Sequence, residues 1–539
     1  MTRHIGIIRR TSDSHDIEEA LAVLDERDLR QLITELVDQL DSGTRGLAID
    51  RIVDRATRKN AGWAPKGPTG EAVAKIVAFA EAARQVGWTE PEVVDGYLRQ
   101  GSAAFLRKDY EMARRIFGTL LPPLSNGEIV VGQEEMVEEA LSIDVQACAA
   151  SHVVSVYMTS APDDRPEAVR AAIEDVGDLG VFWQPLRAME CVATEPLPDF
   201  QGFVRRWRSL IESCAPGTPI GGWQSDEDRW LREVVERLEG TDGLARVARE
   251  TRSGANLQAW CRHLVDARNW EAALSAFDEA AETTQDEKYW RSTFLEGAAL
   301  AAQELGRRDL PIRLERAWRE APGLLGLRQW LGSARSKARV RKLAREALAD
   351  CPKEDRAQQA LLHLVLGDHA SAAQVLSRAP GLGWSREEHP GHLLFSLYPG
   401  LLGRGSSTSS ALESETAVPN EFTPGGTGPD KPRLRAAEAR DIVKTAGIRG
   451  PISGDDRVAI LAGLRSAAAH RIARLTREKR SRYYDHAASL VATCVALDPS
   501  PTTQAWVTRL RIRYRRYHAL QRELGARLDE AGAKPARRR

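Results

Sequence analysis

The sequence lacks several features that would assign it to a familiar class of protein. No run of apolar residues reaches the roughly 18 to 20 that a membrane-spanning helix needs. Residues 1–10 contain no apolar stretch long enough for a secretory signal. Strict alternation of apolar and polar residues is also scarce, so extended sheets are not expected. We therefore expect a cytoplasmic, largely helical protein.

Cysteine is scarce, and its spacing excludes the common metal and redox motifs. The six cysteines are far apart, and no C-x-x-C pair exists that could form half of a zinc ribbon or a thioredoxin-type site. Each cysteine lies in or beside a helical pattern, so we predict buried free thiols. The six are Cys148, Cys191, Cys214, Cys261, Cys351 and Cys494. We expect no bound metal or cofactor.

Net charge is absent as well, but the charges are unevenly distributed. The 76 Lys and Arg balance the 76 Asp and Glu. Residues 431–539 hold 25 basic against 10 acidic residues, a surplus of +15, so the preceding 430 residues carry −15. Such a division indicates either docking between the two parts or a separate partner for each.

Helical periodicity is what the sequence has in abundance. Residues 29–40 repeat apolar side chains at i, i+3, i+4 and i+7, and Asp25 precedes them as a candidate N-cap. Two short stretches, 127–131 and 153–158, have strand-like composition, and we expect at most one stray hairpin there. Further helices are predicted at about 69–86, 90–121, 133–150, 163–176, 199–213, 227–239, 256–281, 287–305, 336–350, 355–378, 434–447, 455–480, 483–497 and 502–531.

One segment interrupts the helical pattern. Residues 403–432 are rich in Gly, Ser, Thr and Pro, and they cannot bury enough apolar surface to offset the entropy of ordering. We predict a flexible linker there, followed by a smaller basic helical module. The predicted organisation is a disordered terminus at 1–15, helical repeat regions at 16–220 and 221–402, the linker at 403–432, the basic module at 433–531 and a basic tail at 532–539.

Several helix pairs carry the packing pattern of the tetratricopeptide repeat. In that helical hairpin, small residues let two backbones approach and large residues fill the gap to the next hairpin. The best match is Tyr97, Gly101, Tyr110, Ala113 and Phe117. Further matches are Trp270, Ala273, Phe277 and Ala280; Tyr484, Ala487, Val491 and Pro499; and the weaker sets His369, Ala372, Leu376 and Ala379, and Phe294, Ala298, Ala317 and Pro322. We predict an all-α fold, an α-solenoid of divergent tetratricopeptide-like hairpins with a small separate helical C-terminal module.

Other stretches resemble the helical region that accompanies SWIM zinc fingers in a group of bacterial proteins. They are 24–32, 126–129, 289–322, 366–370 and 388–390, and the resemblance covers about residues 20–400 and 483–524. A SWIM finger needs C-x-C followed by C-x-H, because zinc takes four N or S ligands. This sequence has no C-x-C, and its C-x-H at 261–263 falls inside a repeat helix. The resemblance thus implies a helical interaction region without the metal module.

The motifs that could carry chemistry have simpler structural interpretations. His-Pro-Gly-His at 389–392 places two imidazoles near each other, but Pro-Gly disrupts the helical alignment of ligands, so we predict a polar turn before a helix near Leu393. His363 and His369 are predicted to face solvent. The Gly-rich stretch 425–432 lacks the Gly-Lys-Ser/Thr of a phosphate loop. No nucleophile elbow or kinase signature is present, and we predict no enzymatic activity.

The basic C-terminal segment is the most informative candidate site. Taken as one helix, residues 502–531 have an apolar stripe with arginines on the opposite face. The stripe is Trp506, Leu510, Tyr517, Leu520 and Leu524; the arginines are Arg511, Arg515 and Arg522; and the tail adds Arg537, Arg538 and Arg539. Clustered arginines can contact nucleic-acid phosphates or an acidic partner. The alternative is a solvated helix docked on the acidic body.

We expect a non-enzymatic scaffold for protein–protein interactions, because stacked hairpins form extended surfaces that bind peptides or protein segments. One alternative is a nucleic-acid-associated protein that binds through residues 431–539. Another is an enzyme whose site leaves no sequence motif. We expect a protein or peptide partner and no membrane.

Overall fold

The computed structural model divides the chain into two compact units, residues 1–240 (unit 1) and 241–539 (unit 2). It describes residues 21–59, 63–132, 136–180, 182–214, 225–384, 388–403 and 432–530. The predicted disordered terminus at 1–15, nearly all of the predicted linker at 403–432 and the tail at 532–539 lie outside the described residues. Within the described stretches, no helix is both long and apolar enough to cross a membrane.

The division between the units falls within one helical stretch, α12 (Asp226–Thr251). This stretch is kinked at Gly240, whose φ of 62° and ψ of −145° lie outside the helical range. Glycine adopts this conformation at little steric cost, so the chain can leave one unit and enter the next at this position. The predicted boundary at 220/221 lies outside the described residues.

Unit 1 is almost wholly helical in its described part. Its elements, apart from two short strands, are α2 (Glu26–Asp38), α3 (Ser42–Lys59), α4 (Gly70–Val86), α5 (Pro91–Leu106), α6 (Tyr110–Ser125), α7 (Val137–Ala140), α8 (Val145–Thr159), α9 (Arg165–Val176), the 3₁₀ turn η1 (Gly177–Gly180), α10 (Pro185–Val192), α11 (Phe200–Cys214) and the start of α12. The predicted cap of the first of these helices is confirmed, because the Asp25 side chain accepts a hydrogen bond from the Asp28 N–H at 2.8 Å.

The core of unit 1 forms around α8. Side chains on every side of this helix are buried, among them Ala149, His152, Val153 and Tyr157, and α5, α6, α9 and α10 pack against it. A helix that is apolar all round has no clear 3.6-residue period, so its sequence resembles that of a buried strand. For this reason the strand considered at 153–158 was wrong, and these residues belong to α8.

The described strands form one short parallel pair. β1 (Trp88–Thr89) pairs with β2 (Val130–Val131), with Trp88 opposite Val130. A parallel pair needs a long crossover connection, and the α5–α6 hairpin supplies it. The strand-like composition at 127–131 is thus confirmed, but the expected hairpin is wrong because the two strands run in the same direction.

Unit 2 continues with helices throughout its described residues. After α12 they are α13 (Gly254–Asp266), α14 (Trp270–Thr283), α15 (Lys288–Glu304), α16 (Leu310–Glu320), α17 (Leu324–Gly332), α18 (Lys337–Asp350), α19 (Arg356–Leu366), α20 (His369–Ser377), α21 (Pro390–Leu401), α22 (Ala439–Thr445), α23 (Gly454–Arg477), the 3₁₀ turn η4 (Ser481–Tyr483), α24 (Tyr484–Leu497), α25 (Pro501–Arg513) and α26 (His518–Glu530). Most predicted helical ranges longer than about 20 residues are two helices joined by a short turn.

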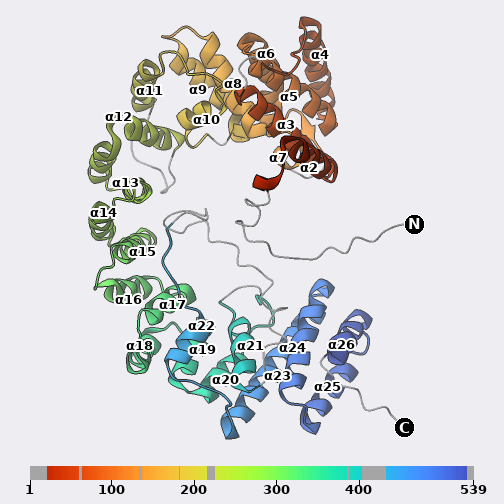
Figure 1. Ribbon diagram of the computed structural model, residues 1–539, viewed down its shortest axis with the longest axis vertical. Coiled ribbons are helices and arrows are strands. Elements are labelled where there is room, and N and C mark those ends of the chain that lie inside the picture. Colours follow the sequence, from red (N-terminus) through yellow and green to blue (C-terminus); the bar gives the residue numbers. More distant parts are fainter. Residues whose placement is uncertain are drawn as a thin grey trace. The chain divides into compact units, whose positions relative to one another are not determined.

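Each helix of unit 2 packs mainly on its neighbours in the chain. Contacts run in series from α13 to α20, continue from α20 to α23, and then reach α24 and α26, an order that can be followed along the ribbon in Figure 1. Packing between successive elements is the defining property of a solenoid. The prediction of an all-α solenoid is confirmed for the described residues.

Three hairpins share one turn geometry. In each, a residue with left-handed φ precedes an Asp or Asn whose side chain accepts a hydrogen bond from the N–H three residues later. The pairs are Lys108–Asp109, Arg268–Asn269 and Gly367–Asp368, with φ of 66°, 53° and 83° at the first residue and ψ of 70°, 74° and 76° at the second. The N–H of the second residue also bonds the carbonyl five residues earlier. Each turn therefore caps the ends of both helices.

Two glycines let consecutive helices approach each other closely. A Cβ at Gly101 would lie only 2.7 Å from the Phe117 ring, and a Cβ at Gly297 would overlap the Phe277 ring. The first pair joins α5 to α6 and the second joins α15 to α14. The small-residue position assigned to Gly101 from the sequence is thus confirmed by the packing.

The C-terminal helices are not a separate module, contrary to the prediction. A single hydrophobic core runs from Ala299 to Leu528 and includes residues on both sides of the 403–432 segment. α23 packs along α20 so closely that a Cβ at Gly463 would lie 2.7 Å from the Ala373 carbonyl oxygen. The prediction failed because a linker-like composition does not by itself mark a domain boundary. The helices before and after residues 403–432 bury their apolar faces in the same core.

Candidate functional site

The predicted basic face of a single C-terminal helix does not exist in the structure. The helix expected over 502–531 is broken into α25 and α26 by a turn at residues 514–517. Arg511 therefore lies on α25, Arg515 in the turn and Arg522 on α26. Arg511 donates its Nε–H to the Gln521 side-chain oxygen at 3.2 Å. Since 100° periodicity does not continue through a turn, these three arginines share no helix face.

Of the other predicted contacts, the structure describes Arg522 but not the three tail arginines. Arg522 lies 3.4 Å from Glu523 through its Nε atom, so it is partly neutralised. Arg537, Arg538 and Arg539 lie outside the described residues.

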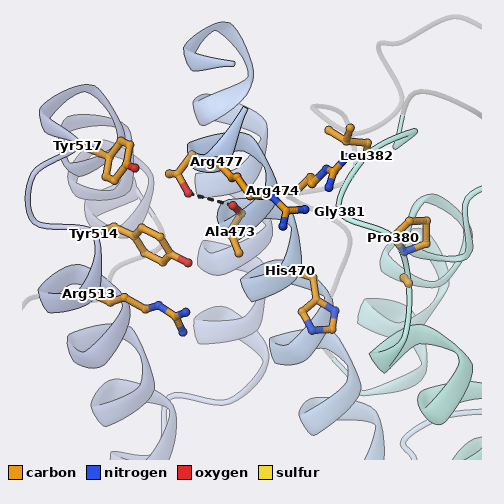
Figure 2. A pocket seen from close by; sticks show the side chains of 12 residues that line it. Pro380, Gly381, Leu382, His470, Ala473, Arg474, Arg477, Arg513, Tyr514 and Tyr517 are labelled. Carbon is orange, nitrogen blue, oxygen red and sulfur yellow. Dashed lines mark hydrogen bonds between the residues drawn. The ribbon is translucent and has the colours of Figure 1, made fainter. Parts of the chain in front are cut away.

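A different group of cationic side chains comes together in unit 2. They line a cavity of about 880 Å³, shown in Figure 2. The described lining residues are Ala379, Pro380, Gly381 and Leu382 after α20; His470, Ala473, Arg474, Thr476 and Arg477 on α23; and Arg513, Tyr514 and Tyr517 at the α25–α26 turn. We call this the arginine–tyrosine cavity. Figure 2 shows the two tyrosines and Arg513 on one side of the α23 arginines and the Pro380–Leu382 segment on the other.

The segment after α20 is held against α23 by backbone contacts. A Cβ at Gly381 would lie 2.6 Å from the His470 carbonyl oxygen and would overlap the Arg474 side chain. Arg471 donates from Nη1 to the Gly381 carbonyl oxygen at 3.1 Å, and its guanidinium carbon lies 5.4 Å from the centre of the Tyr483 ring. The close packing of Gly381 on α23 and the hydrogen bond from Arg471 therefore hold this wall of the cavity in place.

The cavity is electropositive. No Asp or Glu is among the described residues that line it. Arg474 is paired with Glu478, Nε to Oε1, at 2.5 Å. Arg477 and Arg513 are exposed, and neither forms an ion pair with a residue that the structure describes. Two guanidinium groups thus remain available to an anion.

Two tyrosines add aromatic surface to the same cavity. Tyr514 is buried and Tyr517 is exposed, and their ring centres are 6.1 Å apart at an interplanar angle of 63°. The guanidinium carbon of Arg513 lies 5.6 Å from the Tyr514 ring centre, which orients that arginine by a cation–π contact. The turn at 514–517, which the sequence periodicity did not predict, is what brings these groups to α23.

The histidines singled out in the sequence have structural roles. His389 is 4% exposed and caps α21, because its Nδ1 accepts from the Gly391 N–H at 3.0 Å while its Nε2 bonds the Pro380 carbonyl oxygen at 2.8 Å. The predicted polar turn before Leu393 was wrong, since Pro is well suited to the first position of a helix and α21 begins at Pro390. His369, predicted to face solvent, is also buried.

Metal binding has no support in the described residues, where no cluster of three or more His, Cys, Asp or Glu side chains could hold an ion. The C-x-H at 261–263 lies within α13, and Cys261 is buried. Cys148, Cys261 and Cys494 are buried free thiols as predicted, whereas Cys191 is exposed. Burial raises the pKa of Cys148 and of Cys494 to about 12, so neither is a thiolate at neutral pH.

A second cavity, of about 740 Å³, lies in unit 1 among α3, α5 and α8. Part of its polar lining is already paired: Arg99 lies 3.2 Å from Asp50 and donates to the Ser142 carbonyl oxygen at 3.2 Å. Asp95 accepts backbone hydrogen bonds from Ser142 at 3.0 Å and Ile143 at 3.1 Å. These bonds fix the loop before α8 on α5, which is a structural task. The lining of this cavity includes Asp50, Asp54 and Asp144, whereas no described residue that lines the arginine–tyrosine cavity is acidic. We therefore take the arginine–tyrosine cavity as the candidate site for an anion.

The arginine–tyrosine cavity had a partial signature in the sequence. Arg471, Arg474 and Arg477 recur every three residues near the end of one helix, a spacing that brings side chains near one face. By contrast, the sequence does not assign Arg513 to the same cavity, because that assignment requires knowing where α25 ends.

Comparison with known proteins does not assign this chain to a group. No protein-family model matches the sequence, and no curated protein matches it.

Proposed function

We propose that this protein is a non-enzymatic scaffold that binds a protein partner through a surface of tetratricopeptide-like hairpins. The observation that carries the proposal is the serial packing of α13 to α20 and onward to α23, α24 and α26. Such packing leaves each hairpin with surface that no neighbour covers, and solenoids use that surface for binding. The shared turns at 108–109, 268–269 and 367–368 support the tetratricopeptide-like assignment.

Exposed apolar side chains indicate where a partner could dock on unit 2. Tyr289 on α15, Ile312 on α16 and Leu325 on α17 are 55%, 68% and 49% exposed. These helices follow one another in the stack and pack in sequence. Burying such apolar and aromatic side chains against a partner is favourable, because the hydrophobic effect drives most protein–protein association.

Affinity purification followed by reconstitution tests the scaffold proposal. The tagged full-length chain, purified from its native cells, should recover a stoichiometric protein partner. In binding assays with that purified partner, Ile312→Ser and Leu325→Ser should each weaken the complex by about tenfold or more. Val458→Ser is the matched control, because Val458 is 64% exposed and lies on α23, away from these helices in the stack. Recovery of no partner, together with a bound metabolite or metal, contradicts the proposal.

The surplus of positive charge in residues 431–539 supports a second candidate, nucleic-acid binding. The test should use the full chain, because cutting at residue 431 would expose the core that α22 to α26 share with α15 to α21. Binding through phosphate contacts predicts retention on immobilised DNA or RNA that falls steeply as salt rises above about 0.1 M. Absence of retention below that concentration excludes this candidate.

A further inference from the structure

We propose that the arginine–tyrosine cavity of unit 2 is a binding site for a phosphate monoester. This inference goes beyond the scaffold proposal, since it concerns a different surface and a defined ligand chemistry. The cavity, of about 880 Å³, falls within the roughly 300–1,000 Å³ of typical small-ligand sites. It is lined by cationic and aromatic side chains from two parts of the fold that only the folded stack brings together.

The charge of the cavity selects an anion. Arg477 and Arg513 are both exposed and have no ion-pair partner among the described residues, and Arg474 has its Nε engaged by Glu478. Arginine is a fork of N–H donors that matches the oxygens of carboxylate and phosphate groups. Because two exposed guanidinium groups and part of a third line one cavity, a ligand with several acceptor oxygens would use them most fully.

The number of donors favours a phosphate monoester over a carboxylate. A carboxylate has two oxygens and one negative charge, which one bidentate arginine can satisfy. A phosphate monoester has three terminal acceptor oxygens and carries about −1.5 to −2 charge at neutral pH. It can therefore accept from arginines on different walls of the cavity, here Arg477 on α23 and Arg513 at the end of α25.

The tyrosines indicate that the phosphate is attached to a larger body. Tyr514 and Tyr517 lie beside Arg513, at the side of the cavity opposite Pro380 and Leu382 (Figure 2). The Tyr517 ring, whose residue is 37% exposed, offers contact area that inorganic phosphate would not use. An edge-to-face pair at 63° leaves no parallel slot for successive stacked bases. This geometry favours a single phosphorylated group, either a free metabolite or a phosphorylated side chain, over a nucleic-acid strand.

Isothermal titration of the full chain with simple probes tests the proposal. Phenyl phosphate should bind at least about tenfold more tightly than benzoate, which has the same ring but a carboxylate. Adenosine 5′-monophosphate and a phosphotyrosine pentapeptide then distinguish a free metabolite from a phosphorylated protein, because the natural class should bind more tightly than inorganic phosphate. Arg477→Gln and Arg513→Gln should each weaken phenyl phosphate by about tenfold.

Arg516→Gln is the matched control. Arg516 is exposed in the same turn as Tyr514 and Tyr517 but is not among the described residues that line the cavity, so its loss should leave phenyl phosphate affinity unchanged. Circular dichroism and the thermal midpoint of each variant should match the parent protein. The proposal is overturned by the absence of binding at about 10 mM phenyl phosphate, by equal affinity for benzoate, by an equal loss in Arg516→Gln, or by binding of oligonucleotides alone.

Discussion

Unit 1 and unit 2 are built from similar hairpins but assemble them differently. In unit 1, α5, α6, α9 and α10 surround one buried helix, α8. In unit 2, each helix packs mainly on its chain neighbours from α13 to α20, and α23 takes the next place in the stack. The same turn, at Lys108–Asp109 and at Arg268–Asn269, occurs in both. Local turn chemistry therefore fixes the hairpin, and the burial pattern of the helices fixes how hairpins combine.

This difference has a consequence for stability. A core centred on one helix loses most of its contacts together, so unit 1 should unfold as one block. In a linear stack, stability is approximately a sum of terms for each repeat and its neighbours. A destabilising substitution in unit 2 should then cause local unfolding near the substituted residue before the whole unit unfolds.

Removing one large core side chain from each unit should have the largest effect. Trp318 is 1% exposed, its ring centre lies 5.1 Å from that of Trp330, and it donates to the Gln358 side-chain oxygen at 2.7 Å. Trp318→Ala leaves a cavity and removes the hydrogen-bond donor of the buried Gln358 side-chain oxygen, at an expected cost of about 3–5 kcal/mol in the free energy of unfolding. Phe117→Ala in unit 1, which removes a fully buried ring, should cost a similar amount.

Hydrogen exchange at increasing urea concentration distinguishes local unfolding in unit 2 from unfolding of unit 1 as one block. Trp318→Ala should first reduce protection in α16 to α19, the helices around the lost ring, while Phe117→Ala should reduce protection throughout the described helices of unit 1. The contrast between a central core and a linear stack would be wrong if both variants lost protection over the same fraction of their units.

Acid should affect unit 2 more than unit 1. Burial lowers the pKa of both His389 and His486 to about 4. Below about pH 6.5 these histidines become protonated in the unfolded chain but stay neutral in the folded protein. Their contribution to the free energy of unfolding is therefore present above pH 6.5 and lost as pH falls towards 4. At pH 4.5 each histidine should lower the free energy of unfolding by roughly 2–3 kcal/mol relative to neutral pH. Glu296, whose pKa is raised by burial, offsets part of that loss.

In unit 1, two groups with shifted pKa values that titrate between about pH 4 and pH 7 act in opposite directions. Burial lowers the pKa of His152 to about 4 and raises that of Glu233 to about 7. The folded Glu233 keeps a proton that the unfolded chain releases above about pH 4.5, so its contribution is present in acid and lost as pH rises through 7. Acid therefore weakens unit 1 through His152 and strengthens it through Glu233.

Urea unfolding at pH 7.5 and pH 4.5, followed by hydrogen exchange for each unit, measures these opposing effects. The midpoint of unit 2 should fall clearly, and that of unit 1 should change little. His486→Phe should reduce the acid sensitivity of unit 2, because the imidazole Nδ1 has no hydrogen-bond partner and the ring already packs against Trp384. An equal fall in both units would show that these histidines do not control the difference.

The sequence predicted well whatever is local in the chain. Helical periodicity located most helices, and the cap at Asp25 and the packing of Gly101 followed from known spacing rules. It failed where burial removes the period, as in α8, and where a turn interrupts a long periodic stretch, as at residues 514–517. The arginine–tyrosine cavity had only a partial signature in the α23 arginines. It could not be predicted as a whole, because Arg513 joins Arg477 in lining it only through the α25–α26 turn and the packing of two helices.

The smallest expected effect tests whether the shared turn is a conformational requirement in both units. Lys108 and Arg268 hold φ of 66° and 53°, whereas Gly367 holds 83° in the equivalent position. Left-handed φ is costly for residues with a Cβ, so Lys108→Gly and Arg268→Gly should each stabilise the protein by about 0.5–1 kcal/mol. Gly367→Ala should destabilise it by about 1 kcal/mol. A Cβ there would meet the nearest atom at 3.4 Å, an ordinary contact, so the cost is conformational. Urea midpoints at constant slope measure all three, and a neutral Gly367→Ala would mean that the side-chain caps alone determine the turn.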